Sequence, residues 1–277
     1  MTPRSVAIAT DIDVLPVGRI VRRRPGYTVV RSPSNPAHFW GNFLVFEEPP
    51  GEGDAHRWEA LFEREFGDEP RVRHRAFTWD RTDGAAGRAR EEFLPRGYEL
   101  DDSIALVAAP SDLRPHRRAN DAVAVRALDP RGDDELWAAV VELQVADREP
   151  GHGEEDHRSF SLARLADRRA HFLAGRAACY VALDPDTGAP AASCGIVVTD
   201  GRGRFQAVET AAAYRRRGIA SRLLVDAARH AARAYSAERF VIVADANYHA
   251  LGLYESLGFV RAERVVGVAW WQGEPGG

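Results

Sequence analysis

The chain has 277 residues, of which 45% are hydrophobic, and its formal net charge at pH 7 is −4. Such a chain can form a packed core in one large domain or two ordinary ones. It lacks the basic excess of a nucleic-acid-binding protein, and no apolar run is long enough to span a membrane. Residues 1–13 hold acidic residues and no apolar signal core, so we expect a cytoplasmic protein without nucleic-acid or membrane partners.

The first part of the chain alternates predicted strands and helices. Apolar runs indicate strands at 42–46, 72–79 and 104–108. A helix capped by Asp54 is expected between the first two strands, and a short helix near 87–94 between the last two. These elements predict a small α/β domain.

Proline and charge mark segment 111–121 as a linker. We therefore expect a domain boundary there, with an accessory α/β domain at 1–115 and a second domain at 121–277. The two parts differ in their motifs, because the chemistry-bearing patterns all lie in the second.

The second part is predicted as a mixed α/β domain. In chain order we expect a strand at 122–128, helices at 133–146 and 159–174, strands at 178–183, 191–199 and 204–210, a helix at 219–235, a strand at 239–244, a helix opened by 245–247 and ended by Gly258, and strands from 259 and through 265–271. Cys179 and Cys194 fall within these strands, where we expect reduced, buried thiols.

The most informative motif is the turn that precedes the helix at 219–235. It reads Arg-x-x-Gly-x-Ala over residues 215–220. A helix start leaves about four N–H groups without intrahelical partners and carries roughly half a positive charge. Gly218 permits close approach of a ligand, so the turn can bind a pyrophosphate, and acyl-CoA is the leading cofactor candidate. The alternative is an ordinary helix with a solvated basic start.

The turn, with Asn247 and the pattern Tyr254-x-x-Leu257-Gly258-Phe259 downstream, resembles the GNAT superfamily of acyl-CoA-dependent N-acyltransferases. The order of predicted elements over about residues 121–272 is similar to that of the family as well. The resemblance implies the GNAT fold, an α/β fold with a mixed (α+β) sheet, and acetyl-CoA as co-substrate without a metal.

The N-terminal part echoes the second half of this domain, because Asp80 and Gly97–Tyr98 parallel Asp245 and Gly258–Phe259. Either a degenerate GNAT-like half in tandem or an unrelated α+β module explains the pattern. The turn equivalent at 47–54 is acidic and rich in proline. It would repel a pyrophosphate, so we expect no CoA there.

The resemblance also implies site residues. Glu209, on the strand before the turn, is the candidate general base, and Tyr254 is the candidate acid beside the thioester sulfur. The expected cofactor-binding residues are Val208 and Thr210 through their main chains, the cradle Arg215, Arg216, Arg217, Gly218, Ile219, Ala220 and Ser221, and Asn247. The bland alternatives are a surface carboxylate for Glu209, a core aromatic for Tyr254 and an N-cap for Asn247.

We expect an N-acetyltransferase in which a bound amine, on a small molecule or a peptide, attacks acetyl-CoA directly in a ternary complex. One rival is a non-catalytic acyl-CoA-binding sensor or partner-binding protein, and another is an enzyme with a hydroxyl acceptor. Acidic residues at 147–156 suit a cationic amine or form a plain hydrophilic loop. The sequence names neither the acceptor nor the oligomeric state.

Overall fold

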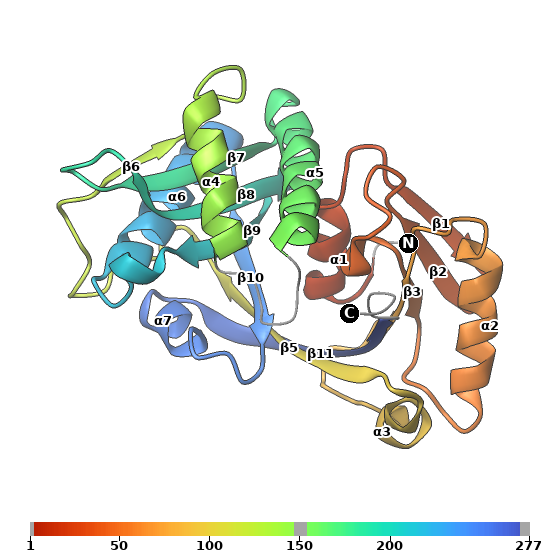
Figure 1. Ribbon diagram of the computed structural model, residues 1–277. Coiled ribbons are helices and arrows are strands. Elements are labelled where there is room, and N and C mark those ends of the chain that lie inside the picture. Colours follow the sequence, from red (N-terminus) through yellow and green to blue (C-terminus); the bar gives the residue numbers. More distant parts are fainter. Residues whose placement is uncertain (1–2, 147–153, 272–277) are drawn as a thin grey trace. The chain divides into compact units, whose positions relative to one another are not determined.

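The computed structural model describes residues 3–146 and 154–271, and it divides the chain into two compact units (Figure 1). The first unit comprises Met1–Ala105, Val243–Tyr248 and Ala262–Gly277, and the second comprises Leu106–Ile242 and His249–Arg261. The units thus do not follow chain order, since the last strand of the chain contributes to the first unit. This division rests on compactness, and the predicted boundary near 115–121 stays a prediction.

The first unit is built on a sheet in which β1 to β4 are neighbours in chain order. Its elements are α1 (Val6–Asp13), β1 (Ile20–Arg24), β2 (Tyr27–Arg31), η1 (Phe39–Gly41), β3 (Phe43–Phe46), α2 (Asp54–Phe66), β4 (His74–Trp79), α3 (Ala89–Glu92), η2 (Leu94–Arg96), most of β5 (Glu99–Ala108) and most of β11 (Val260–Trp271). β1, β2 and β3 pair antiparallel, β3 pairs with β4 in parallel, and β4 pairs antiparallel with β11.

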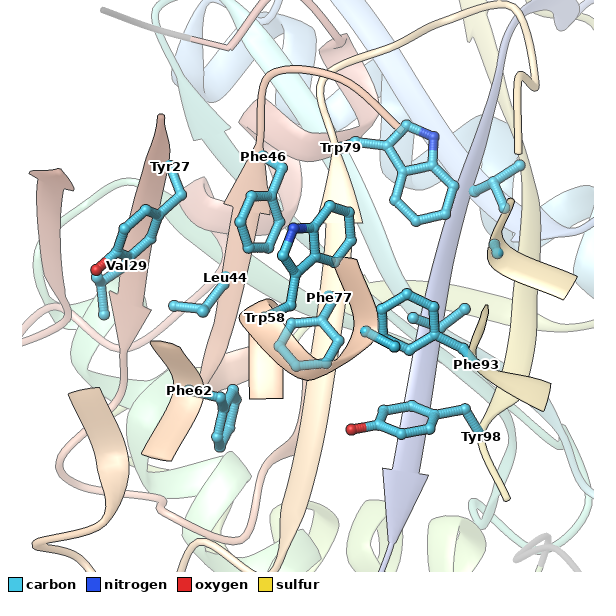
Figure 2. Close-up of a cluster of buried hydrophobic side chains, with 14 of the residues drawn as sticks. Tyr27, Val29, Leu44, Phe46, Trp58, Phe62, Phe77, Trp79, Phe93 and Tyr98 are labelled. Carbon is cyan, nitrogen blue, oxygen red and sulfur yellow. The ribbon is translucent and has the colours of Figure 1, made fainter. Parts of the chain in front are cut away.

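The core of the first unit is aromatic. Trp58, Phe62 and Phe66 recur at four-residue spacing on α2, so they share the face that packs on the strands. The ring of Trp58 stacks on Phe46 of β3 at 3.7 Å between centroids, and Phe77 of β4 packs edge-on against both (Figure 2). Truncating a fully buried Trp of this kind costs about 3–5 kcal/mol.

Two elements of the first unit were not predicted from the sequence. Helix α1 is short, and its N-cap Ser5 accepts a hydrogen bond from the Ile8 N–H. The β1–β2 hairpin is closed by Pro25–Gly26, where Gly26 has a φ of 81°. The Pro-Gly pair between two β-rich runs is the signal that could have revealed this hairpin.

The second unit contains the meander and helices predicted for the second domain. Its elements are β6 (Ala124–Ala127), α4 (Asp134–Ala146), α5 (Glu154–Leu173), β7 (Ala177–Leu183), β8 (Pro190–Thr199), β9 (Arg202–Thr210), η3 (Ala212–Tyr214), α6 (Ile219–Tyr235), part of β10 (Arg239–Asp245) and α7 (Leu251–Ser256). β6, β7, β8 and β9 pair antiparallel in that order, and β9 pairs with β10 in parallel.

Helices cover both faces of this meander. α4 and α5 lie side by side (Figure 1), and Arg168 of α5 interacts electrostatically with Cys179 of β7. The next residue, Tyr180, points to the other face, where its hydroxyl is 2.9 Å from Nδ1 of His230 on α6. Alternation along a strand therefore separates a face covered by α4 and α5 from a face covered by α6.

Most predicted elements are confirmed, but several of their ends differ; β5, for example, begins at Glu99 rather than at residue 104. α5 begins at Glu154, five residues before the predicted start at 159. α7 begins only at Leu251, and its N-cap is Ala250, so Asn247 is not a cap. Asp54 is the first residue of α2 rather than its cap, because its side chain reaches back to accept from the Gly51 N–H. Cys179 and Cys194 are buried and free, as predicted.

Two parts of the chain repeat one order of elements. β1-β2-β3-α2-β4-α3-β5 in the first part of the chain matches β7-β8-β9-α6-β10-α7-β11 in the second. Asp80 follows β4 as Asp245 ends β10, and Gly97 and Gly258 both have positive φ. The echo seen in the sequence is therefore present in the fold.

Candidate active site

One edge of β9 is open over the second half of the strand. The parallel ladder joins residues 202–204 of β9 to residues 239–241 of β10 and goes no further. On its other edge β9 stays paired with β8 as far as Thr210. Within the described part of the chain, residues 205–210 therefore have no strand partner on the edge away from β8.

The hydrogen bonds of the strand end show which main-chain groups face this open edge. The Ala211 N–H donates to the Ala191 carbonyl, so Ala211 and, two residues earlier, Glu209 direct their main chains toward β8. Val208 and Thr210 then direct theirs to the open edge. A β-bulge just upstream, where Ala207 has a φ of 43°, adds one residue to β9 and sets this phase.

The turn after β9 exposes a row of backbone donors. Arg216 and Gly218 are both left-handed, with φ of 64° and 74°, and α6 begins at Ile219. In the described part of the chain, no backbone carbonyl accepts from the N–H groups of residues 216–221. Successive donors around left-handed residues at a helix start form an anion-binding concavity.

The predicted linker packs against this turn. The Asn120 N–H donates to the Gly218 carbonyl at 3.2 Å, and the His116 N–H donates to Ser221 Oγ at 2.8 Å. A Cβ at Gly218 would lie 1.8 Å from the Arg118 carbonyl oxygen. Segment 112–121 is therefore a strap on the second unit, and the glycine is required by its approach as well as by φ.

The same strap holds the end of α7. The Arg114 N–H donates to the Leu257 carbonyl at 3.0 Å, and a Cβ at Gly258 would lie 2.2 Å from the Asp112 carbonyl oxygen. The strap thus joins the helix that carries Tyr254 to the turn at the start of α6. The strap also brings the exposed Arg117 and Arg118 to the turn. The sequence does not predict this, because the prolines and charges of the segment are typical of a linker.

Side chains of the predicted cradle have distinct environments. Arg215 folds back so that its Nε donates to the Thr210 carbonyl at 3.1 Å. The Arg217 guanidinium lies over the Tyr214 ring, 5.5 Å from its centroid, and Arg216 is exposed. Ser221 is buried and its Oγ accepts from the strap, so its hydroxyl serves the strap.

Glu209 is half-buried on the face covered by α4 and α5. It pairs with Ser193 of β8, which in turn pairs with Val181, two residues from Cys179 on the same face. Arg164 and Arg168 of α5 are attracted to Glu209. Burial, helped by repulsion from Arg168 and Arg204, lowers the pKa of Arg164 to about 9, and burial lowers the pKa of Arg168 as well.

The two cysteines are poor nucleophiles. Burial raises the pKa of Cys179 to about 12, and burial raises the pKa of Cys194 too. A thiol with such a pKa stays protonated at neutral pH and does not attack a thioester. Burial of both thiols, Cys179 on the face of α4 and α5 and Cys194 on the face of α6, therefore disfavours an acyl-cysteine intermediate.

Tyr254 belongs to the second unit, and Asn247 belongs to the first. Tyr254, in the second unit, is 5% exposed, and its ring centroid is 6.4 Å from that of Phe259. Asn247 is exposed and belongs to the segment counted with the first unit, where its N–H donates to Asp245 Oδ1. The structure thus brings Val208–Ser221 together around one edge and turn, and Asn247 remains a predicted contact.

Other features of the described residues lie outside this chemistry. No group of three or more His, Cys, Asp or Glu side chains among them is arranged to hold a metal ion, and none of their helices is long and apolar enough to cross a membrane. An open hollow lined by Val198, Gly201 and Tyr235 lies at the opposite end of β9 from the turn. Part of the acidic segment at 147–156, namely 147–153, lies outside the described residues.

Comparisons with known proteins find a family match in the second half of the chain and likenesses to solved structures over most of it. Residues 137–259 match the model of the acetyltransferase (GNAT) family. Among solved structures, a functionally unknown conserved protein from Staphylococcus epidermidis has a TM-score of 0.73 at 15% identity, covering 93% of this chain and 95% of its own. A GCN5-related N-acetyltransferase from Kribbella flavida has a TM-score of 0.61 at 15% identity, with coverage of 99% and 97%.

The tandem arrangement has a structural parallel too. A tandem GNAT protein from the clavulanic acid biosynthesis pathway has a TM-score of 0.57 at 14% identity, covering 96% of this chain and 89% of its own. No curated protein sequence matches the chain. The predicted α/β GNAT fold, with a second GNAT-like part at the N-terminus, is confirmed by these likenesses.

Proposed function

We propose that the protein is an N-acetyltransferase that transfers an acetyl group from acetyl-CoA to an amine acceptor, a small molecule or a peptide. The observation that carries the proposal is the open edge of β9, which leads directly into a turn whose N–H groups at 216–221 donate to no backbone carbonyl among the described residues. Reduced, free cysteines favour the cytoplasm as the compartment.

The residues of the open edge and the turn fit an acyl-CoA. Main-chain groups of Val208 and Thr210 can pair with the two amides of the pantetheine arm as an added strand would. The donors at 216–221 and the arginines at 215–217 suit the pyrophosphate. When bound, acetyl-CoA supplies an activated acyl group as its thioester.

The reaction requires the protein to position the two substrates and to transfer protons. The amine nitrogen forms a bond to the acyl carbon, the carbon–sulfur bond breaks, and the amine loses a proton while the thiolate gains one. An amine with a pKa of about 10.4 is almost wholly protonated at pH 7, so a base is needed. We assign that role to Glu209 and the protonation of the thiolate to Tyr254. Because both cysteines stay protonated, direct attack in a ternary complex is favoured over a covalent relay.

A thiol-release assay with acetyl-CoA and a panel of amines tests the proposal, with mass spectrometry of the product. We expect acceptor-dependent release and an N-acetyl product. Acyl-CoA binding without release by any acceptor would favour a sensor, and an O-acetyl product would identify a hydroxyl acceptor.

Two conservative variants test the assigned roles. Glu209→Gln should remove the fall in rate on the acidic side of the pH–rate profile, where a carboxylate base becomes protonated, with a loss of about 10²–10⁴-fold in kcat. Tyr254→Phe should lower kcat while leaving the affinity for CoA intact. An unaltered profile or an unchanged rate, respectively, would remove each residue from the mechanism.

A further inference from the structure

Helix α5 holds two neighbouring arginines, of which Arg168 is buried and Arg164 is half-buried. Arg164 and Arg168 are one helical turn apart, so they share a face of the helix. Arg168 is only 6% exposed, and neither its Nε nor its Nη2 has a hydrogen-bond partner within the described part of the chain. A guanidinium carries five N–H donors, and leaving them unpaired in a buried place is costly.

The strand side of this face adds polar groups. Ser193 of β8 is 1% exposed, and its Oγ likewise has no hydrogen-bond partner among the described residues. Its strand partner is Glu209, the residue toward which both arginines are attracted. Donors from α5 and β8 thus lie on the face that carries the proposed base.

Glu209 faces the two arginines of α5 from the strands, and both are attracted to its carboxylate. The buried residues of α4 are all uncharged, and two of its acidic residues, Asp134 and Glu142, pair outward with Arg169 and Arg158. Two nitrogen atoms of the Arg168 guanidinium therefore stay without a hydrogen-bond partner among the described residues.

A buried guanidinium whose N–H groups lack hydrogen-bond partners, such as that of Arg168, is stabilised when an anion arrives. Among anions, a carboxylate matches the planar fork of an arginine with two parallel hydrogen bonds. The Ser193 hydroxyl can donate a further bond. Glu209 on the same face is negatively charged and attracts a cationic amine instead. One small molecule that carries a carboxylate and an amine would therefore pair with the arginines and with Glu209 at once.

We propose that the acceptor is a zwitterion, an amine that also carries a carboxylate, and that Arg168 with Arg164 binds this carboxylate while Glu209 receives the amine. The inference rests on the proposed N-acetyltransferase function and adds the class of acceptor. It assigns to α5 the role of setting specificity. Arg168 and Arg164 are specificity-determining residues in this assignment and take no part in proton transfer.

Matched compounds test the class of acceptor. Thiol release from acetyl-CoA is measured with the common α-amino acids, β-alanine and 4-aminobutyrate, each beside its primary amide and its decarboxylated amine. We expect the best amino acid to exceed its amide and its amine by about 100-fold or more in kcat/KM, because loss of the carboxylate leaves the arginines unpaired. Equal use of amides or plain amines would overturn the inference while the transferase function stands. Release by none of the compounds, nor by the wider amine panel, would instead count against the function itself.

An arginine variant separates specificity from structure. In Arg168→Met, the KM for the preferred amino acid should rise about tenfold or more, with a smaller change in kcat and an unchanged KM for acetyl-CoA. Without acceptor, the same variant should melt about 2–4 °C higher than the parent protein, because a buried unpaired charge has been removed. The matched control is Arg169→Met on the same helix, whose guanidinium pairs with Asp134, and it should leave the KM for the amino acid unchanged.

Two results would overturn the assignment of Arg168 and Arg164 to the carboxylate of the acceptor. A lower melting temperature or failure to fold in Arg168→Met, with Arg169→Met intact, would make Arg168 a structural residue and overturn the proposal. A preference for an aminoalkyl phosphate over every amino acid would overturn the carboxylate assignment.

Discussion

Burial of the single residue His74 makes the stability of the first unit depend on pH. Its side chain is 3% exposed, its Nε2 lies 3.1 Å from the Asn42 carbonyl oxygen, and its ring stacks on Phe39. Burial disfavours the charged ring and lowers the pKa of His74 from 6.5 to about 4. The folded first unit therefore holds a neutral imidazole over a range where the unfolded chain holds a protonated one.

This difference makes stability depend on pH. Between pH 6.5 and about 4 the unfolded chain binds a proton that the folded ring does not, so stability falls as the pH falls through this window. The loss attributable to His74 is about 3 kcal/mol. Urea unfolding at pH 7 and pH 4 should show that His74→Gln loses less stability than the parent protein over this interval. An equal loss in both proteins would contradict the buried neutral ring.

Gly218 is the residue on which the strap and the turn both depend. An alanine there would adopt a φ of 74° and place its Cβ 1.8 Å from the Arg118 carbonyl oxygen. We expect Gly218→Ala to destabilise the protein by more than about 2 kcal/mol and to weaken CoA binding, because the strap must move. Gly252→Ala in α7 is the control, since nothing lies within 4 Å of its added Cβ.

Gly252→Ala should stabilise the protein slightly, by about 0.5–1 kcal/mol, through helix propensity alone. Urea unfolding and CoA titration of both variants make the comparison. If Gly218→Ala behaved as Gly252→Ala does, the strap would not rest on the turn as described.

Candidate site residues differ in how far the sequence alone can predict them. Gly218 stands at a fixed place in a local motif, and Glu209 lies on the predicted strand just before it, so both are candidates from the sequence. Arg164 and Arg168 face Glu209 only because α5 packs on the meander, where it lies against β7, and a helical arginine is usually solvated. The contacts of the strap could not be predicted for the same reason, since its partners are about a hundred residues away in the chain.

At the scale of elements, the two parallel strand pairs differ. In the first unit β3 stays paired with β4 through Phe46, and the Asp80 N–H adds a bond to the Phe46 carbonyl. In the second unit β9 and β10 part after residue 204, which leaves an edge for an added strand. The same order of elements therefore produces strands that stay paired to the end of β3 in the first unit and strands that separate midway along β9 in the second.

Two proline variants test the open edge. Thr210→Pro removes an N–H that points to the open edge, so the affinity for CoA should fall about tenfold while stability changes little. Ala211→Pro suits the backbone, with a φ of −53°, and removes the N–H that donates to Ala191. It should cost about 1 kcal/mol of stability and keep the affinity for CoA. Melting curves and CoA titrations measure both, and a reversed pattern would show that the strand phase is wrong.

Element types were predictable where periodicity was strong, as in α6 with its buried stripe of Leu223, Ala227 and Ala231. Boundaries were less so. α7 starts late, because Asp245 caps a turn by accepting from the Asn247 N–H before any helix begins. The separation of β9 and β10 has no sequence signature of its own, since both strands continue with β-forming residues such as Val208, Thr210 and Val243 beyond their last shared pair.

At the scale of the molecule, one repeated order of elements carries one candidate site. The first unit fills the place of the open edge with its ladder and with Trp58 stacked on Phe46, and the loop before α2 is acidic. The second unit combines the open edge, the basic turn and the strap. We therefore expect one acyl-CoA to bind per chain, at the second unit.

Hydrogen exchange with and without CoA shows whether the one acyl-CoA binds at the second unit. We expect CoA to slow exchange of the amides of Val208, Thr210 and residues 216–221, and to leave the exchange of amides at 47–54 unchanged. Protection at 47–54, or binding of CoA without protection at the open edge and turn of the second unit, would contradict it.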